Sequence, residues 1–389
     1  MLNDRVARYI ERIGAIAPVI AAHAEQSERD ARLAPATVEA MHEAGLFRIF
    51  LPARLGGGDL TIPESVRLYE EVASIDGSAG WNLAICAGGP LFGHFVTPAA
   101  YEEIFADARA VVAGSLNPMT MRAEAVDGGY RYSGTATYVS GSAQASWIAV
   151  SGLVLSDGSP TFTDGVPLVR SALVPMRHFR IHDTWSVSGM CGTGSNECTC
   201  ENVFVPEGFT YAWPDPHTTW RAGAYATIPL VTQLGGALAA VALGVARHAI
   251  SAFMDLAGAK VPTGTRATLR ERPLAQLQLA QAEGLLGAAR AYLHAMLDEI
   301  WRAGETGVPF DAAARAKARL ASLTAARLAA QAVDLIHDAA GATSIQRSSA
   351  FERCWRDVHA ITQHVILSTG RFEIVGRVML GLDPGGPII

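Results

Sequence analysis

Cysteine and excess charge are both scarce in this sequence. Five of its 389 residues are cysteine, an odd number in a chain large enough to fold without disulfide staples, which predicts a reducing, cytoplasmic location. The net charge of −6 is small, and no run of Lys or Arg occurs. We therefore expect neither a nucleic acid nor an anionic membrane surface among its partners.

The N-terminal stretch lacks the uninterrupted apolar centre of a signal peptide or a membrane span. In "MLNDRVARYIERIGAIAPVIAAHAEQSERD" charged residues recur throughout the apolar pattern. A membrane-spanning helix needs about 20 consecutive, mostly apolar residues. We therefore expect no secretory signal and no membrane anchor in this segment.

Several motifs of nucleotide, hydrolase and metal chemistry are also missing. The stretch "LGGGDL" lacks the Lys-Ser/Thr of a phosphate loop and is better explained as a turn. The stretch "GMCGTGS" runs into a strand-like segment instead of opening a helix, which argues against a Rossmann dinucleotide site. No G-x-S-x-G elbow follows a buried strand. The Cys198-Thr-Cys200 pair has no second ligand pair at zinc spacing, so no metal site is expected.

Three regions of different pattern follow one another along the chain. Residues 1–110 and 216–389 show the period of amphipathic helices, and the second region contains long, alanine-rich segments suited to a bundle. Residues 111–215 consist of short β-branched and aromatic runs, with Asp127-Gly128-Gly129 as a hairpin signal. The sequence predicts a mainly α, α+β protein with an N-terminal helical domain, a central antiparallel β-domain and a C-terminal helical bundle.

The stretch "FERCWRDVHAITQH" near the C-terminus is expected to be helical and carries two histidines. His359 and His364 would diverge by about 140° around a helix, so they cannot share one metal ion. His359 lies nearer charged neighbours and is expected to be structural. For His364 the residues alone leave both a packed and a catalytic side chain open.

The stretch "YVSGSAQASW" places small hydroxyl residues and a glycine directly after a predicted strand. Such a strand end lets the backbone approach a planar ligand, to which Ser140 can give a hydrogen bond. A strand that ends in an ordinary turn has the same pattern, and the residues alone leave both interpretations open.

Taken together, these stretches resemble the acyl-CoA dehydrogenase superfamily over nearly the whole chain. The resemblance rests on "LPARLGGGDL", "SIDGSAGWNLA", "GYRYSGTATYVSGSAQASWI", "DTWSVSGMCGTGSNECTCENVFVPE" and "RCWRDVHAITQHVILSTGRFEIVGRVMLGLDP". The last three look most like the flavin-dependent monooxygenases on this fold, which include the oxygenase components of p-hydroxyphenylacetate hydroxylase and dibenzothiophene monooxygenase. The resemblance implies a C-terminal four-helix bundle and assembly as a homotetramer.

One absence separates the two activities that this superfamily implies. Many acyl-CoA dehydrogenases place a glutamate base shortly after the arginine-aspartate pair of this helix, whereas here no carboxylate occurs between Asp357 and Glu373. Other dehydrogenases carry the base on another helix, so an FAD-dependent acyl-CoA dehydrogenase stays the alternative. The monooxygenase branch has a histidine at the matching place, where His364 falls.

The resemblance therefore favours the oxygenase component of a two-component monooxygenase that hydroxylates a small aromatic or heteroaromatic substrate. Reduced flavin, FMNH2 or FADH2, would come from a separate NAD(P)H:flavin reductase. Its reaction with O2 would give a C4a-hydroperoxide of the flavin. An imidazole with an ordinary pKa near neutrality suits proton transfer from a phenol and hydrogen bonding to this flavin species. The expected catalytic residues are His364, Ser140 and His94.

The resemblance also implies the other site residues. Ser140 would hydrogen-bond flavin N5 and share in catalysis, while His94 and Trp81 would form one wall of the substrate pocket. Further flavin contacts are implied for Trp81, Ser115, Asn117, Tyr138, Gly141, Thr193 and Ser195. Contacts to phosphate across a subunit boundary are implied for Arg266, Gly341 and Ser344.

Overall fold

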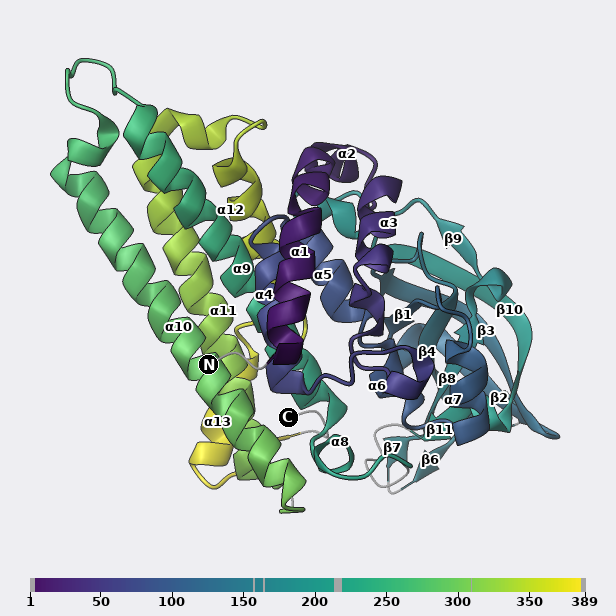
Figure 1. The fold of residues 1–389 in the computed structure, drawn as a ribbon. Coiled ribbons are helices and arrows are strands. Elements are labelled where there is room, and N and C mark those ends of the chain that lie inside the picture. The colour runs from purple at the N-terminus through teal and green to yellow at the C-terminus, as the bar shows by residue number, and fades with distance from the viewer. Residues whose placement is uncertain (1–3, 157, 164, 213–218, 309, 386–389) are drawn as a thin grey trace.

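The fold runs from helices through strands to helices again, as the colours of Figure 1 show. The structure is a computed structural model that describes residues 4–156, 158–163, 165–212, 219–308 and 310–385. The predicted mainly helical α+β class is confirmed. The division at residues 110 and 111 stays a prediction, and the predicted boundary at residues 215 and 216 lies outside the described residues.

Helices build the first part of the chain. They are α1 (Asp4–Ala22), α2 (Ala24–Arg29), α3 (Pro35–Glu43), α4 (Ile62–Ala73), α5 (Gly77–Cys86), α6 (Gly89–Gly93) and α7 (Pro98–Phe105). Side chains cap several of the helix starts, among them those of α4 and α5. The Thr61 hydroxyl accepts from the Glu64 N–H in a capping box, and the Asp76 carboxylate accepts from the Ala79 N–H at 2.8 Å. The second cap fixes the start of α5, the helix that carries Trp81.

The central part forms a nine-stranded sheet and a separate two-stranded ribbon. The strands are β1 (Val112–Ser115), β2 (Met121–Val126), β3 (Gly129–Val139), β4 (Trp147–Ser156), β5 (Ser159–Pro160), β6 (Phe162–Thr163), β7 (Val166–Pro167), β8 (Val169–Pro175), β9 (Arg180–His182), β10 (Asn196–Pro206) and β11 (Thr210–Ala212). The main sheet has the order β11-β8-β4-β2-β3-β10-β9, and β1 and β5 also pair with β4. The predicted hairpin is confirmed, because Val126 of β2 pairs with Gly129 of β3 across a turn in which Gly128 has φ 77°.

The sheet is mixed, which corrects the prediction of an antiparallel β-domain. Both β1 and β2 run parallel to β4. Alternation of apolar residues reports which side of a strand is buried, but it does not report the direction of the neighbouring strand. The β1 pairing positions the site, because the end of β1 also bridges Gly114 to Ser140.

The last part of the chain forms a bundle around one central helix. Its helices are α8 (Ala224–Thr227), α9 (Leu230–Ala259), α10 (Pro273–Glu305), α11 (Ala312–Ala340), α12 (Ala350–Ile361) and α13 (Arg371–Met379). The central helix, α9, contacts α10, α11 and α12 within the bundle and α4 and α5 outside it. By length and composition α9 could cross a membrane, but 72% of its most apolar window is buried inside the protein, as in the core helix of a bundle.

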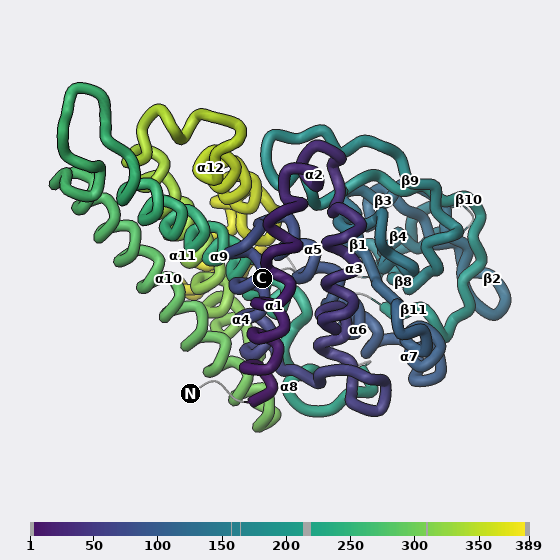
Figure 2. The backbone as a smooth tube through the Cα atoms, turned by 45° about the horizontal axis from the view of Figure 1, so that its top comes forward, coloured from purple at the N-terminus to yellow at the C-terminus, as the bar shows by residue number. Residues whose placement is uncertain are grey.

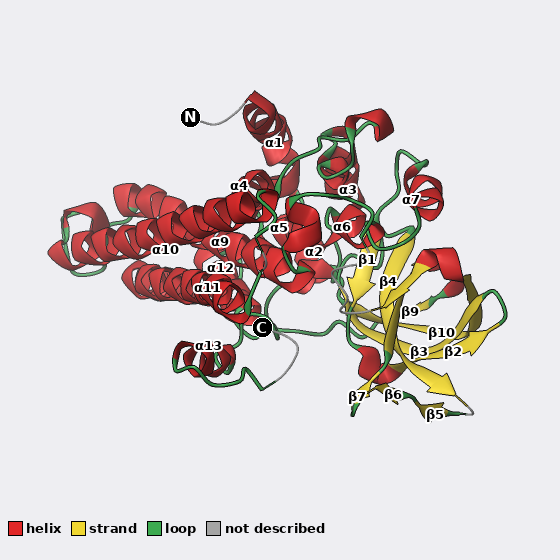
Figure 3. Ribbon diagram, turned by 90° about the horizontal axis from the view of Figure 1, so that it is seen from below, coloured by secondary structure: helices red, strands yellow, loops and turns green. Residues whose placement is uncertain are grey.

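The two largest of the hydrophobic clusters among the described residues form the main cores. The larger core joins the N-terminal helices to the bundle and includes Leu68, Leu83 and Val241, all fully buried. The smaller core lies within the sheet around Tyr132 and Val150. Figures 2 and 3 show α5 between the bundle and the sheet, in agreement with its contacts to α9 and β1. Residues carried by α5 therefore face both parts.

The contact of α4 with α9 depends on a glycine. A Cβ added at Gly244 would lie 2.3 Å from the Glu70 carbonyl oxygen and 2.5 Å from the Ala73 Cβ. We expect Gly244→Ala to lower the free energy of unfolding by about 1–3 kcal/mol through overpacking, seen as a lower Tm. The control is Gly284→Ala in α10, where a Cβ meets nothing within 4 Å. It should be neutral or stabilising by about 0.5–1 kcal/mol, and equal losses for both variants would contradict the packing argument.

Candidate functional site

A chain of hydroxyl groups connects the loop before β10 to the end of β3. The Thr193 Oγ1 atom lies 2.8 Å from the Met190 carbonyl oxygen and 2.7 Å from Ser195 Oγ. The Ser195 Oγ atom lies 2.7 Å from Ser140 Oγ, which accepts from the Trp81 indole N–H at 3.0 Å. The three hydroxyl residues are buried. The structure thus brings Trp81, Ser140, Thr193 and Ser195 together, as expected.

The direction of the hydrogen bonds along this hydroxyl chain follows from its two ends. The Met190 carbonyl can only accept, so Thr193 donates its single hydrogen there. Ser195 must then donate to Thr193, and Ser140 must donate to Ser195. The Trp81 indole can only donate, so it occupies one acceptor position of Ser140. Ser140 is left with one acceptor position and no hydrogen to give.

Ser140 lies in the turn at the end of β3, between two residues whose backbone φ angles are positive. Tyr138 has φ 57° and Gly141 has φ 76°. The Gly141 N–H donates to the Thr193 carbonyl at 2.9 Å, and a Cβ at Gly141 would lie 2.4 Å from Cys86 Sγ. Tyr138 is 73% exposed and its ring lies 6.2 Å from that of Trp185. The two rings are nearly perpendicular, at 85°, so an exposed tyrosine ring with an edge-on tryptophan lies next to Ser140 in the turn.

His364 lies beyond the end of the helix on which it was expected. Helix α12 ends at Ile361, with Thr362 as its C-cap. The Thr362 hydroxyl donates to the His359 carbonyl at 2.8 Å, and such local side-chain bonds compete with the helical pattern. The expectation of a continuous helix through residue 364 is wrong, so the angle argued for the two histidines does not hold.

The imidazole of His364 packs edge-on against Trp81, with ring centroids 5.5 Å apart. Its Nδ1 atom accepts from the Ile366 N–H at 3.3 Å, which leaves the hydrogen of a neutral ring on Nε2. Burial, assisted by repulsion from Arg319, lowers the pKa of His364 to about 4. At neutral pH the side chain is therefore a neutral Nε2–H donor, in contrast to the near-neutral base that was expected.

Helix α12 is anchored to the loop that begins the hydroxyl chain. The buried Asp357 carboxylate accepts from the Met190 N–H at 2.5 Å. Arg356 donates to the Ser188 carbonyl and pairs with Glu28 and Glu352. These bonds fix the Met190 carbonyl and, through it, the direction of the hydroxyl chain.

His359 has the structural role that was expected of it. Its Nε2 atom lies 2.9 Å from the Asp334 carboxylate, and its ring lies 4.7 Å from that of Trp355. Both rings line an open groove of about 600 Å³, together with Ser188 and Gln363. This groove is open to solvent and is bordered by α12, by His337 of α11 and by Ile345.

Ser115 and Asn117 lie at the end of β1, beside the Gly114 bridge to Ser140. Ser115 is buried, whereas Asn117 uses its side-chain oxygen to accept from the Met119 N–H at 3.1 Å. Within the described residues neither of them forms a hydrogen bond with the hydroxyl chain, although both lie near the β1 end that bridges to Ser140.

His94 lies in a separate aromatic cluster. Its ring contacts those of Tyr101, Trp220 and Tyr225, and its Nε2 atom lies 3.1 Å from Arg221 Nη1. Burial, followed by the Arg221 charge, lowers the pKa of His94 well below its ordinary value. Among the described residues no hydrogen bond, ion pair or ring contact joins His94 to the hydroxyl chain or to His364, although Tyr101 and Tyr225 share a hydrophobic core with Trp81.

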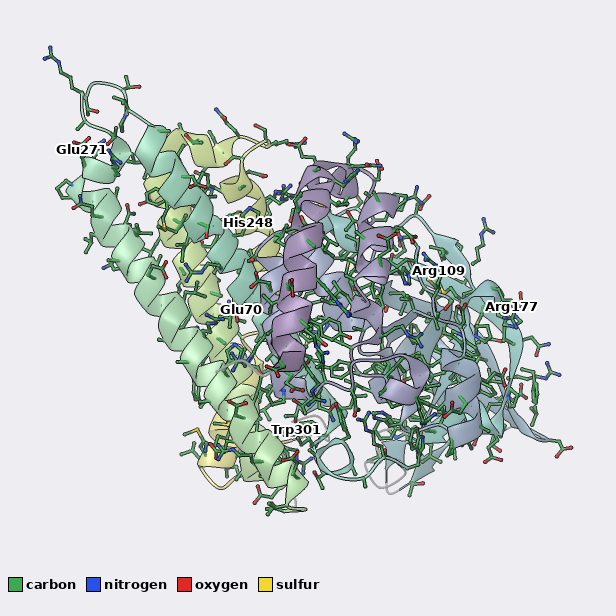
Figure 4. All side chains as sticks on the ribbon, viewed as in Figure 1. Glu70, Arg109, Arg177, His248, Glu271 and Trp301 are labelled. Atoms are coloured by element: carbon green, nitrogen blue, oxygen red, sulfur yellow. The ribbon has the colours of Figure 1, made fainter. Side chains whose placement is uncertain are left out.

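Arg266, Gly341 and Ser344 lie at the end of the bundle that points away from the sheet. Arg266 is exposed and belongs to the segment between α9 and α10 that also contains Glu271, which Figure 4 labels at the tip of the bundle. Gly341 ends α11 with φ 59°, and the Ser344 hydroxyl donates to its carbonyl at 2.8 Å. Within the described residues these three have no bond to the hydroxyl chain.

Sequence reasoning missed Arg319 of α11. This arginine is 5% exposed, and its Nη1 atom donates to the Ile366 carbonyl at 3.1 Å, two residues beyond His364. The sequence did contain a signal for its burial, because Arg319 lies in an apolar stripe with the buried Ala316 and Leu323 on the same helix face.

The described residues contain no group of three or more His, Cys, Asp or Glu that could hold a metal ion.

Two family models match the helical parts of the chain. The one described as "Acyl-CoA dehydrogenase, N-terminal domain" matches residues 1–111, and "Acyl-CoA dehydrogenase, C-terminal domain" matches residues 237–369. In structure the chain is similar to 3-HSA hydroxylase from Rhodococcus sp. RHA1, with a TM-score of 0.90 and 25% identity over 98% of this chain and 99% of that one.

Three curated relatives are similar over nearly their whole length. The oxygenase subunit HsaA of a flavin-dependent monooxygenase from Mycobacterium tuberculosis is 30% identical over 96% of this chain and 95% of that protein. Indole-3-acetate monooxygenase of Pseudomonas putida is 29% identical over 92% and 90%. The oxygenase component of an FADH2-dependent resorcinol hydroxylase from a Rhizobium species is 29% identical over 97% and 95%.

The chain belongs to the acyl-CoA dehydrogenase family, with the fold that was expected. Within this family it groups with the flavin-dependent monooxygenases. The predicted oxidoreductase class and the reduced flavin cofactor are thereby confirmed.

Proposed function

We propose that this protein is the oxygenase component of a two-component monooxygenase in which Ser140 selects reduced flavin and His364 positions an aromatic substrate. The observation that carries the proposal is the hydrogen-bond direction of the hydroxyl chain, which leaves Ser140 as an acceptor. Reduced flavin carries a hydrogen on N5, whereas oxidised flavin has only a lone pair there. An acceptor facing N5 therefore favours the reduced form.

The residues around Ser140 suit a planar, polar ring. Tyr138 offers an exposed aromatic ring next to the half-buried Trp185, and Gly141 lets the backbone approach closely. We assign the flavin contacts to these residues and to Trp81, Ser115, Asn117, Thr193 and Ser195. Bound reduced flavin supplies the electrons with which O2 is activated.

In this proposal the protein's own side chains orient the substrate and exclude water from the site. The His364 Nε2–H donates to an oxygen of the substrate, while its ring and that of Trp81 form an apolar wall that excludes water. His94 stays a proposed residue of the substrate pocket, although in the described residues its ring contacts join it to Tyr101 and Tyr225 and not to Trp81 or His364. Asp357 is engaged with Met190 and is poorly placed to serve as a dehydrogenase base.

The proposed partners are a separate reductase and further copies of this chain. A separate NAD(P)H:flavin reductase supplies the reduced flavin in the cytoplasm, and a homotetramer lets Arg266, Gly341 and Ser344 reach the cofactor of a neighbouring subunit. The location of these three residues at the far end of the bundle supports this arrangement. A nucleic acid or a membrane has no part in the proposal.

The test mixes the protein with FMNH2 or FADH2 under argon and then adds O2. We expect the protein to slow flavin reoxidation, to give more than one absorbance phase and to delay peroxide release. A parallel sample with oxidised FAD and a panel of acyl-CoA thioesters should show no bleaching of the flavin. Bleaching by a thioester, or reoxidation identical to that of free flavin, would refute the proposed function.

A further inference from the structure

A second open groove, the α1 groove, has a volume of about 520 Å³ and lies between α1 and the bundle. Figure 4 shows His248 beside α1, at the border with the bundle. Among the described residues that line this groove, none is acidic and none belongs to the hydroxyl chain. The lining includes Ala17, Pro18 and Ala21 of α1, Ile75 after α4, His248 of α9 and Arg353 of α12.

Arg353 brings a positive charge to the α1 groove. Its guanidinium forms neither a hydrogen bond nor an ion pair with the described residues. Its charge acts on the buried carboxylates of Asp76 and Asp357, but burial raises the pKa of both, that of Asp357 to about 7. The Asp76 carboxylate is also committed to the start of α5, where it accepts from the Ala79 N–H. These two groups therefore offset the charge of Arg353 only in part.

His248 is the second polar group that faces the same space. Burial, followed by the charge of Arg353, lowers the pKa of His248 to about 4, so the imidazole is neutral at neutral pH. A neutral imidazole carries one N–H, and this ring forms no hydrogen bond with the described residues. Ser74 also lines the groove, but its hydroxyl donates to the Glu71 carbonyl at 2.7 Å. The side-chain donors left in the groove are therefore the guanidinium and the imidazole.

Small residues of α1 keep the groove open beside these donors. Ala17 and Ala21 lie one turn apart on the same helix face, and a Cβ added at Gly14, one turn earlier, would meet no atom within 4 Å. With Pro18 and Ile75 they give the groove mostly apolar walls. Two adjacent donors, one of them charged, match the two oxygens of a carboxylate, and the apolar walls match a short hydrocarbon chain.

We propose that the α1 groove binds a small aliphatic carboxylate, with Arg353 and His248 donating to its two oxygens and with the walls of α1 and Ile75 covering its chain. The bound carboxylate supplies the counter-ion that Arg353 lacks at close range. The site is separate from the flavin and substrate site of the proposed function and does not depend on it.

The test measures the Kd values of isovalerate, isovaleramide and inorganic phosphate by isothermal titration of the full chain at neutral pH and fixed ionic strength. Isovalerate should bind about tenfold or more tightly than the amide, which has the same shape without the charge. Phosphate has the charge without the chain and should bind more weakly than isovalerate. Saturating reduced FMN, added under argon, should leave the Kd of isovalerate unchanged, because the two sites are separate.

Three variants locate the binding. Arg353→Gln should reduce the affinity for isovalerate to that of the amide. Ala17→Leu fills the groove with a residue that favours helices, leaves both donors in place and should also weaken binding about tenfold, which decides the matter if the first variant misfolds. The matched control is Arg247→Gln, which removes a charge next to His248. Arg247 does not line the groove and pairs with Glu283 at 2.7 Å, so its variant should keep the wild-type Kd.

Equal affinity for isovalerate and its amide would overturn the proposal, and so would phosphate that binds as tightly as isovalerate. Equal losses in Arg247→Gln and Arg353→Gln would reveal a general effect of charge and would overturn it too. Competition between isovalerate and reduced FMN would place the probe in the flavin site and contradict a separate groove. None of these results touches the proposed function, which the flavin reoxidation experiment tests by itself.

Discussion

Replacing His364 with alanine is expected to lower the rate of substrate oxygenation by about 10²–10³-fold, the usual cost of losing one aligned hydrogen-bond donor, and thereby to lower the yield of product per reduced flavin. The variant loses the Nε2–H donor beside Trp81, while Ser140 and its hydroxyl chain stay in place. Flavin binding should change little, and flavin reoxidation should release peroxide instead of product. The measurement is product and peroxide per flavin, with an aromatic probe that the wild-type protein oxidises.

The matched control is His359→Ala, which removes a histidine from the same segment. His359 pairs with Asp334 at the rim of the groove and has no bond to the hydroxyl chain. Its variant should keep most of the coupled activity. Wild-type coupling in the His364 variant, or equal losses in both variants, would remove His364 from its proposed role.

Replacing Thr193 with valine is expected to reduce the preference for reduced over oxidised flavin by about 3- to 10-fold, which corresponds to one net hydrogen bond. Valine keeps the shape of the side chain but cannot donate to Met190 or accept from Ser195. Ser195 is then free to donate to Ser140, and Ser140 regains a hydrogen with which to serve the lone pair of oxidised flavin. The measurement is the ratio of the two Kd values in each protein.

Ser142→Ala is the control for this prediction. The Ser142 hydroxyl donates to the Gly194 carbonyl at 2.9 Å in the same loop region, but it does not belong to the hydroxyl chain. Its variant should keep the wild-type ratio of Kd values. An unchanged ratio in Thr193→Val would show that the direction of the hydroxyl chain does not control the choice of flavin.

Much of the fold follows from local patterns in the sequence. Pro35 at the start of α3, Pro273 at the start of α10 and the Gly128 turn act through their own backbone restrictions. The period of apolar residues predicts the long bundle helices because each buries one face. These signals need no knowledge of distant residues.

What the sequence could not predict depends on contacts between distant segments. The parallel pairing of β1 with β4 depends on where each strand lies in the sheet. The end of α12 at Ile361 depends on a competing bond from Thr362, although the segment contains no glycine or proline. The neutral state of His364 follows from burial against Trp81, which lies on α5.

The most direct test of the account is an anaerobic titration of the wild-type protein with reduced and with oxidised flavin. Ser140 has one acceptor position and no hydrogen left to donate. The account therefore predicts that the reduced form binds about tenfold or more tightly than the oxidised form. Equal affinity for the two forms, or tighter binding of the oxidised form, would contradict it.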